Sequence, residues 1–445
     1  MKTMFICLIC KLAIFVGKLL NRGSVLPGFI ALKLDAKILY KLKLPNIVIA
    51  VTGSSGKGGT TKMLADSYRN MGYTVSYNDA GSNIDYAITT CLINNSSITG
   101  RVKTDVIVLE IDERFAKVIF PAIKPTHVAI TNITRDQPPR QGNVDIILNE
   151  ICIALNSDMN LILNGDDPYL QKIVLQKQFK SVSYFGIKEN DYTYKENMFE
   201  NLNIYHCPKC HSTLNYDYYT FETNGSYHCS NCDFKRVKID YEVTSLDYEK
   251  EILTVNNKYE LNIPINILFS VYNMLSAFTV IASTGISLES ITESFNKIVF
   301  KQDYLNSYKI DERMVHISNN KNENSTTFNQ TLLYMERYKG PKTIVVGWKE
   351  ISRRYEFNDL SWLYDITFEM FNRHEFDKVV CVGIQQYDIA VRMKLAGIDE
   401  GKIECFGNLL EAVAYIKKET KNDIFAVLNF DYVEPFDKLM KGEQI

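Results

Sequence analysis

The sequence predicts an α/β protein built on a buried parallel sheet, and three observations support this prediction. Four short apolar segments are rich in β-branched residues and contain almost no polar interruption. Each of them ends in polar or acidic residues, and stretches with helical periodicity separate them. Uninterrupted apolar strands of this kind are typical of parallel sheets that helices cover on both faces. We place these strands at 45–52, 105–109, 127–131 and 159–163.

The chain is long enough for more than one such unit. It has 445 residues, of which 46% are hydrophobic, and a domain usually takes about 100–200 residues. We expect an N-terminal helical segment at 1–44 and a central domain at 45–300. A smaller, Rossmann-like α/β domain is expected at 301–445, because three more apolar strands occur there, at 343–347, 378–383 and 423–428.

Charge and cysteine content exclude some classes of protein. The net charge is −2, so the chain has no dense basic field, and we expect no nucleic-acid partner. Ten cysteines in 445 residues are too few for a disulfide scaffold. Most of the cysteines outside one cluster lie in apolar runs, as reduced thiols do in a cytoplasmic protein.

The first 20 residues are apolar with a basic start, like a signal peptide. Lys11 interrupts the apolar run, Lys18 closes it, and no small-residue cleavage site follows. The run is also shorter than the stretch of about 20 apolar residues that spans a bilayer. We favour a helix that packs on the protein, and the alternative is a helix at a membrane surface, which would place the protein at the inner face of the membrane.

A glycine-rich loop follows the first strand and precedes a helix expected at 60–71. Backbone N–H groups in such a loop, together with the helix N-terminus, bind phosphate, and Lys57 would reach the β- and γ-phosphates of a nucleotide. The expected nucleotide-binding residues of the loop are Gly53, Ser54, Ser55, Gly56, Lys57, Gly58, Gly59, Thr60 and Thr61. The alternative is a loop that no longer binds ATP, because Gly58 stands where this motif has Ser or Thr as a Mg²⁺ ligand.

Acidic residues follow the strand at 105–109. For Glu110 we favour a Mg²⁺ ligand, either direct or through water. For Asp112 and Glu113 we favour acids in the first turn of a helix. Polar residues at the ends of the next two strands are equal candidates for contact with nucleotide or substrate, or for neither: Asn132, Asp136, Asp166 and Asp167.

Four cysteines lie in two CxxC pairs, Cys207 with Cys210 and Cys229 with Cys232, separated by 18 residues. This spacing is typical of a closed tetrahedral Zn²⁺ site with a structural role. Metal binding would order a hairpin module that is too small to fold alone, and we place this zinc ribbon at 204–238 as an insertion in the central domain. Histidines 206, 211 and 228 are expected at the surface, because four thiolates complete the coordination shell.

Taken together, these motifs resemble the Mur ligase superfamily, and within it the MurT family of lipid II isoglutaminyl synthase subunits. The resemblance covers nearly the whole chain. It rests on the zinc ribbon, on the glycine-rich loop and on the segments 22–28, 31–35, 108–113, 131–137, 163–168, 359–369 and 383–397. It implies a Mur ligase-like central domain with a smaller C-terminal α/β domain.

The resemblance also implies an activity. A protein of this family uses ATP and Mg²⁺ to phosphorylate the α-carboxyl of D-glutamate in lipid II, and ammonia then forms D-isoglutamine during peptidoglycan synthesis. The ammonia comes from a GatD-type glutaminase partner. By the same resemblance Lys57 and Glu110 are catalytic, and Asn273 lies near the adenine. Asp359 is matched to an aspartate that reaches the catalytic histidine of the glutaminase, with Asp365 as the second choice and helix capping as the alternative role for Asp359.

Several positions depart from the family pattern. Gly58 replaces a threonine, and Lys301-Gln302 replaces a Gly-Arg pair that contacts phosphate. Ser276 replaces the second asparagine of the adenine motif. Two other functions therefore stay open: an amino-acid ligase of the Mur or folylpolyglutamate type, and a catalytically impaired scaffold that binds a glutaminase-like partner.

Overall fold

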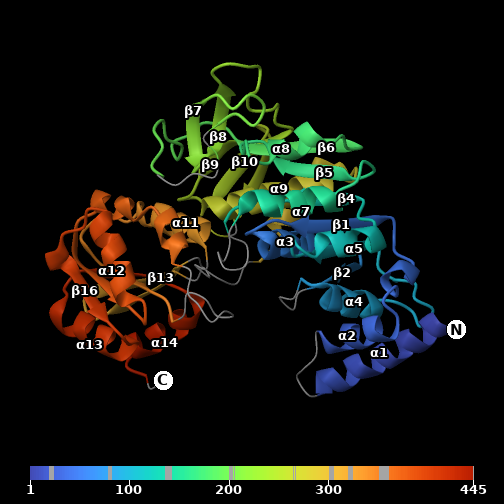
Figure 1. The fold of residues 1–445 in the computed structure, drawn as a ribbon, viewed down its shortest axis with the longest axis horizontal. Coiled ribbons are helices and arrows are strands. Elements are labelled where there is room, and N and C mark those ends of the chain that lie inside the picture. Colours follow the sequence, from blue (N-terminus) through green and yellow to red (C-terminus); the bar gives the residue numbers. More distant parts are fainter. Residues whose placement is uncertain are drawn as a thin grey trace. The chain divides into compact units, whose positions relative to one another are not determined.

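The computed structural model describes residues 1–19, 25–78, 83–135, 143–199, 204, 206–263, 265, 267–299, 305–318, 324–349 and 360–443. The chain forms two compact units. The first comprises Met1–Ile133, Asp145–Glu196 and Ile204–Phe300, and the second comprises Thr134–Val144, Asn197–Asn203 and Lys301–Ile445. Figure 1 shows the elements of each unit along the chain.

The first unit contains a sheet of nine strands in the order β11-β10-β9-β6-β5-β4-β1-β3-β2. Strands β2 to β6 and β9 extend the parallel part on both sides of β1, and β10 and β11 add an antiparallel edge. The strands are β1 (Ile47–Thr52), β2 (Val75–Tyr77), β3 (Val106–Glu110), β4 (His127–Ile130), β5 (Asn160–Asn164), β6 (Ser181–Ile187), β9 (Tyr241–Asp247), β10 (Ile252–Val255) and β11 (Tyr259–Asn262). The four apolar segments of the sequence are thus confirmed as neighbouring parallel strands.

Some helices of the first unit cover this sheet, and others come before its first strand in the chain. α3 and α9 pack against each other and on the strands, so their N-terminal turns lie at the carboxyl edge of β1. The helices are α1 (Lys2–Leu19), α2 (Leu26–Leu34), α3 (Lys57–Asn70), α4 (Asp85–Asn94), α5 (Ala116–Ile123), α7 (Val144–Ala154), α8 (Gln171–Gln176), α9 (Leu268–Ser283) and α10 (Leu288–Asn296), with a short 3₁₀ turn η1 at Leu39–Lys41.

The N-terminal segment folds as two helices that pack on the protein, as favoured from the sequence. One face of α1 is buried, through Ile6, Cys7, Cys10 and Ile14. α1 packs against α2 and α4. In the described residues, no helix combines the length and apolar character needed to span a bilayer.

A two-stranded antiparallel hairpin, β7 (Leu214–Phe221) with β8 (Asn224–Cys229), forms the predicted ribbon within the first unit. Its core is aromatic: Tyr227 is buried between Tyr216 and Phe234, and its hydroxyl donates to the Gly165 carbonyl. The ribbon is therefore anchored at the end of β5.

The second unit contains a six-stranded sheet in the order β12-β13-β17-β14-β15-β16, parallel except for the β12–β13 hairpin. α13 and α14 pack on one face of it. An Asn324–Thr327 capping box begins α11. The elements are β12 (Leu305–Ile310), β13 (Arg313–Ser318), α11 (Ser325–Met335), β14 (Lys342–Gly347), η2 (Ser361–Asp365), η3 (Phe368–Arg373), β15 (Phe376–Val382), α12 (Gln386–Leu395), η4 (Glu400–Lys402), β16 (Ile403–Phe406), α13 (Leu409–Glu419), β17 (Asp423–Leu428) and α14 (Phe430–Lys441).

Candidate nucleotide site and zinc centre

The glycine-rich loop joins β1 to α3 and requires glycine at two positions. Gly53 and Gly56 have φ angles of 127° and 82°, in the region that disfavours side chains. A Cβ at Gly53 would lie 2.3 Å from the Thr131 hydroxyl oxygen. Gly56 is the N-cap of α3, which begins at Lys57. The N–H groups of the first turn of α3 have no acceptor within the helix, and such a turn binds anions.

The residues that follow β4 hold this loop in place. The Ser54 amide donates to the Asn132 carbonyl (2.9 Å), and the Ser55 amide donates to Asn132 Oδ1 (3.0 Å). Thr131 Oγ1 and Asn132 Nδ2 both donate to the Ser55 carbonyl, at 2.6 and 3.1 Å. Asn132, a predicted candidate for ligand contact, therefore holds the glycine-rich loop directly.

The Lys57 ammonium group lies inside the loop. It donates to the carbonyls of Gly53 and Ser54, and it lies 3.4 Å from a carboxylate oxygen of Glu113. The Glu113 side chain is 1% exposed, and α5 begins only at Ala116. The interpretation of Glu113 as an acid in a helix first turn is therefore wrong, because this carboxylate is buried against the expected catalytic lysine.

Asn273 reaches the same loop from α9. A Cβ at Gly56 would lie 2.3 Å from Asn273 Oδ1, and a Cβ at Gly59 would lie 3.0 Å from Asn273 Nδ2. The side chain of Asn273 thus lies against the beginning of α3, and only glycine leaves room for it at position 56. The structure brings this residue to the other expected nucleotide contacts across more than 200 residues of sequence.

Glu110 lies at the end of β3, beside the unusual residue of the loop. A Cβ at Gly58 would lie 3.2 Å from Glu110 Oε2, which is tighter than ordinary van der Waals contact. Glu110 Oε1 accepts a hydrogen bond of 3.0 Å from Asn83 Nδ2. The missing side chain at Gly58 therefore lets a carboxylate approach the first turn of α3. An oxygen ligand beside a phosphate loop suits Mg²⁺, so Glu110 and the loop fit a Mg²⁺-nucleotide.

The hydroxyl groups of the two loop threonines differ in their contacts. Thr61 Oγ1 donates to the Lys57 carbonyl (2.9 Å) of its own helix. Thr60 Oγ1 is buried and has no hydrogen-bond partner among the described residues. Asp112 accepts from both the backbone and the guanidinium of Arg114, at 3.0 Å each, and closes the turn before α5.

The aspartates at the end of β5 serve the fold. Asp166 is completely buried, and it accepts hydrogen bonds from Arg236 of the ribbon, from the Ile187 amide and from the Tyr272 hydroxyl. Burial raises the pKa of Asp166, and the Arg236 guanidinium opposes this shift. Burial also raises the pKa of Asp167 to about 7, and its carboxylate accepts from the Tyr169 amide (2.8 Å). The Tyr272 hydroxyl also pairs with Thr220 Oγ1 of β7 (2.7 Å), so α9 contacts both the loop and the ribbon.

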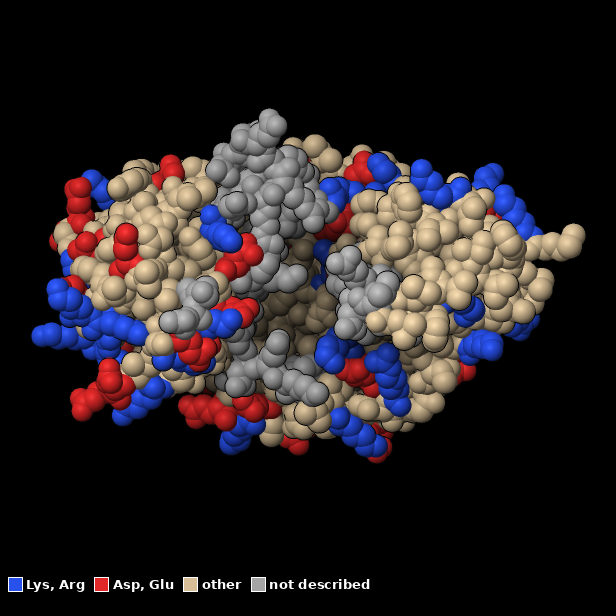
Figure 2. Space-filling view, turned by 90° about the horizontal axis from the view of Figure 1, so that it is seen from below, with Lys and Arg blue, Asp and Glu red and all other residues tan. Residues whose placement is uncertain are grey.

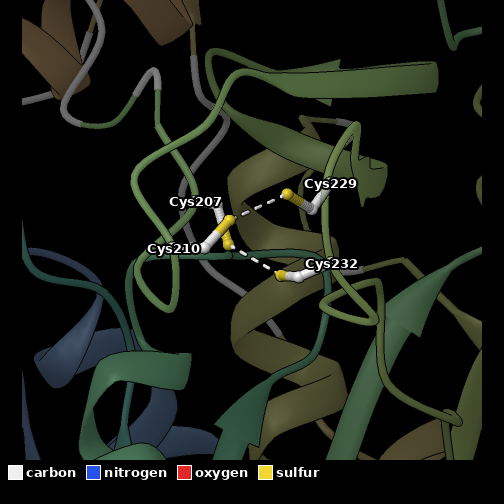
Figure 3. Close-up of side chains that lie close together, drawn as sticks. All are labelled: Cys207, Cys210, Cys229 and Cys232. Atoms are coloured by element: carbon white, nitrogen blue, oxygen red, sulfur yellow. Dashed lines mark hydrogen bonds between the residues drawn. The ribbon is translucent and has the colours of Figure 1, made fainter.

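The four ribbon cysteines converge as predicted (Figure 3). Their sulfur atoms all lie within 4.8 Å of one another, with 3.6 Å between Cys207 and Cys232 and 3.4 Å between Cys210 and Cys229. Sulfur atoms bound to one tetrahedral Zn²⁺ at about 2.3 Å are about 3.8 Å apart. The donor set and its spacing therefore fit zinc.

Backbone amides support the same interpretation. The Lys209 amide donates to Cys207 Sγ and the Asn231 amide to Cys229 Sγ, at 3.4 and 3.3 Å. Hydrogen bonds from Ser212 lower the pKa of Cys210 to about 6, whereas burial raises the pKa of Cys207. The three histidines of the ribbon, at 206, 211 and 228, are exposed, as expected.

Some expected site residues lie outside the described residues: Asp136, Lys301, Gln302 and Asp359. Asp365 is described, and it pairs with Arg135 of the same unit at 3.0 Å. Arg135 also donates to Ser361 Oγ (2.6 Å). The Asp365 carboxylate is therefore engaged by Arg135.

The sequence did not indicate the structural roles of Asn83, Arg236 and Tyr272. It also suggested a wrong role for Glu113. Asn83 and Arg236 lie in no recognisable motif, and Tyr272 directly precedes Asn273 of the adenine motif. The acidic cluster after β3 was a signal for Glu113, but the sequence alone could not decide which carboxylate faces the loop.

Comparison with known proteins places this geometry in a family. Residues 51–281 match the model of the Mur ligase middle domain. The chain belongs to the Mur ligase family. Members of this family are ATP-dependent ligases. Residues 322–432 of this Mur ligase match the model of the MurT ligase C-terminal domain.

Two similar proteins carry the name lipid II isoglutaminyl synthase (glutamine-hydrolyzing) subunit MurT. The one from Staphylococcus aureus (strain COL) is 29% identical over 86% of this Mur ligase and 85% of its own length. The one from Streptococcus pneumoniae (strain ATCC BAA-255 / R6) is 27% identical over 97% of this chain and 95% of its own length.

Solved structures share the fold. A pseudomurein peptide ligase type C from Methanothermus fervidus superposes with a TM-score of 0.68 at 18% identity, covering 92% of this Mur ligase and 80% of that chain. MurF ligase from Thermotoga maritima in complex with ADP gives a TM-score of 0.60 at 17% identity, covering 93% and 84%. The predicted Mur ligase-like α/β fold is thereby confirmed.

Proposed function

We propose that this chain is the synthetase subunit of a two-chain enzyme that amidates the α-carboxyl of D-glutamate in lipid II. The carboxylate attacks the γ-phosphorus of ATP, which gives an acyl phosphate and ADP. Ammonia then attacks the acyl carbon and phosphate leaves, so that D-isoglutamine forms. A glutaminase of the GatD type supplies the ammonia.

One observation carries this proposal. A Mur ligase middle domain and a MurT C-terminal domain occur in one chain, and relatives named as MurT subunits match this chain over 85–95% of their own length. The relatives named UDP-N-acetylmuramoylalanine–D-glutamate ligase match only 29–43% of this chain. This difference favours amidation over the addition of an amino acid.

The loop residues have roles that suit phosphoryl transfer. The Lys57 ammonium and the first-turn amides of α3 would neutralise the β- and γ-phosphates. Glu110, held by Asn83, would hold Mg²⁺, which supplies further neutralisation of the transferring phosphoryl group. Glu113 keeps the lysine within the loop, so we assign it a positioning role.

The second unit offers a surface for the glutaminase. An apolar row is exposed on α12 and just before it: Ile384, Tyr387, Val391 and Leu395. From the same helix, Arg392 is buried, binds the Glu369 carboxylate (2.7 Å) and donates to the Ile366 carbonyl (2.8 Å). The row is thus rigidly joined to the segment after η2. An exposed apolar row of this size is typical of a protein interface.

ATP-dependent amidation with ammonium chloride tests the synthetase role without the partner. We expect Mg²⁺-ATP binding and conversion of lipid II to its amide. Lys57→Ala should lower turnover at least about 100-fold. The control is Lys62→Ala, on the same helix, whose ammonium is exposed and pairs with Asp66. Absence of ATP binding would support the scaffold alternative and would contradict the proposal.

Glutamine-dependent amidation by the complex tests the partner role. Asp359→Asn should remove activity with glutamine and keep activity with ammonium chloride, because only the glutaminase reaction needs this carboxylate. Asp311→Asn, an exposed aspartate in the turn between β12 and β13 of the same unit, is the control. Val391→Glu should weaken the complex at least about tenfold, whereas Leu410→Glu on α13, also exposed, should not. The assignment would be contradicted if Asp359→Asn and its control lost equal activity with glutamine. It would also be contradicted if Val391→Glu and Leu410→Glu weakened the complex equally.

A further inference from the structure

The outer face of α1 is apolar and uncovered in the described structure. Seven large apolar side chains on it are exposed: Met4, Phe5, Leu8, Leu12, Phe15, Val16 and Leu19. At 100° per residue they all fall within an arc of about 120° on a helical projection, opposite the buried face. α2 adds three more exposed apolar side chains, Leu26, Phe29 and Leu34. A contiguous exposed apolar stripe of this kind is typical of an interaction surface.

Charge around this stripe differs from that of the rest of the chain. Residues 1–44 contain eight of the 50 basic residues and one of the 52 acidic residues, Asp35. That acid is paired with Lys41. Lys2, Lys33 and Lys37 are exposed. Figure 2 views the molecule from below, from the side of α1 and α2, and shows a broad uncharged area with basic side chains at its margins.

We propose that the α1–α2 face docks on the surface of an anionic lipid bilayer. The buried face of α1 packs on α2 and α4, so the helix lies along the protein and presents its full length sideways. Its 18 residues extend about 27 Å at 1.5 Å per residue. The apolar stripe would enter the boundary between headgroups and acyl chains, and the lysines would meet anionic headgroups.

The basic residues around the apolar stripe favour a bilayer over a second copy of this chain as the partner of this face. A second copy of this chain would bring two positively charged segments together, and their repulsion opposes such a dimer. An anionic bilayer neutralises the same charge. This inference goes beyond the proposed reaction, because docking requires neither ATP nor the glutaminase.

Flotation of the full chain with vesicles tests the proposal. We expect binding to phosphatidylcholine–phosphatidylglycerol vesicles and weaker binding to phosphatidylcholine alone. The triple variant Leu8→Gln, Leu12→Gln, Phe15→Gln should lose at least about tenfold in partitioning. The control is Ile146→Gln, Ile153→Gln on α7, which changes side chains of similar exposure in the same unit. Circular dichroism should show that both variants fold.

Lysine variants test the electrostatic part. Lys33→Gln, Lys37→Gln should weaken binding to anionic vesicles at least about fivefold and leave binding to neutral vesicles unchanged. The proposal is overturned if the chain does not float, or if the triple variant and its control float equally. It is also overturned if the stripe forms a dimer or binds the glutaminase in a way that excludes vesicles, as light scattering and competition would show.

Discussion

Arg236 of the ribbon and Asp166 at the end of β5 form an ion pair with 2.7 Å between Nη2 and Oδ1. The Asp166 side chain is 0% exposed. The pair joins the zinc ribbon to the parallel sheet, and Tyr272 extends the connection to α9. A buried pair of this kind costs desolvation energy, but the loss of one partner leaves the other charge uncompensated.

Asp166→Asn should therefore lower the free energy of unfolding of the first unit by about 3 kcal/mol. Tryptophan fluorescence would not report unfolding of the first unit, because both tryptophans, Trp348 and Trp362, lie in the second unit. Calorimetry is therefore the suitable measurement. Glu289→Gln breaks the exposed pair with Lys258 and should cost less than about 0.5 kcal/mol. Equal effects would show that the buried pair does not anchor the ribbon.

Asp167 should make stability depend on pH. Burial raises its pKa from 3.8 to about 7 in the folded state, so the folded protein holds this proton more tightly than the unfolded chain. The stabilising contribution is complete below pH 3.8 and is lost as the pH rises towards 7. Asp167→Asn keeps an oxygen acceptor for the Tyr169 amide without the ionisation. Relative to the wild type it should gain stability on the order of 4 kcal/mol between pH 4 and 7. A difference that stays constant with pH would contradict this assignment.

The cysteine cluster should contain about one zinc ion per chain. Cys207→Ser should abolish zinc binding and expose the ribbon to proteolysis, because the metal supplies folding energy to a two-stranded hairpin. Cys152→Ser, outside the cluster, should keep the metal. Elemental analysis and limited proteolysis measure the two effects. Retention of zinc in Cys207→Ser would contradict the four-thiolate site.

Replacing Gly58 by the threonine that usually follows the loop lysine should not raise the ATP turnover of this protein. In Gly58→Thr the new side chain would crowd the Glu110 carboxylate, which lies 3.2 Å from the Cβ position. We expect Mg²⁺-dependent ATP turnover to fall at least about tenfold and the Mg²⁺ requirement to rise. Glu110→Gln should act in the same direction. Higher turnover in Gly58→Thr would show that Glu110 is not placed to hold Mg²⁺.

Much of the fold was predictable because its signals are local. The apolar runs that became β1, β3, β4 and β5 announce buried parallel strands without any knowledge of their neighbours. Shorter or more polar strands, such as β2 and β16, were missed, because sheet pairing rather than their own sequence makes them strands.

The sequence by itself determined the glycine-rich loop and the cluster of four cysteines, since both depend on fixed spacings within short segments. Only the tertiary structure decided that Glu113 faces Lys57, that Asn273 lies against Gly56 and that Asp166 pairs with Arg236. These partners are distant in the chain. They meet because β1, β3 and β5 are parallel strands of one sheet, so the carboxyl ends of these strands lie at the same edge. The uncovered face of α1 was undecided for the same reason: apolar residues occur on both sides of this helix, so only packing shows which side stays uncovered.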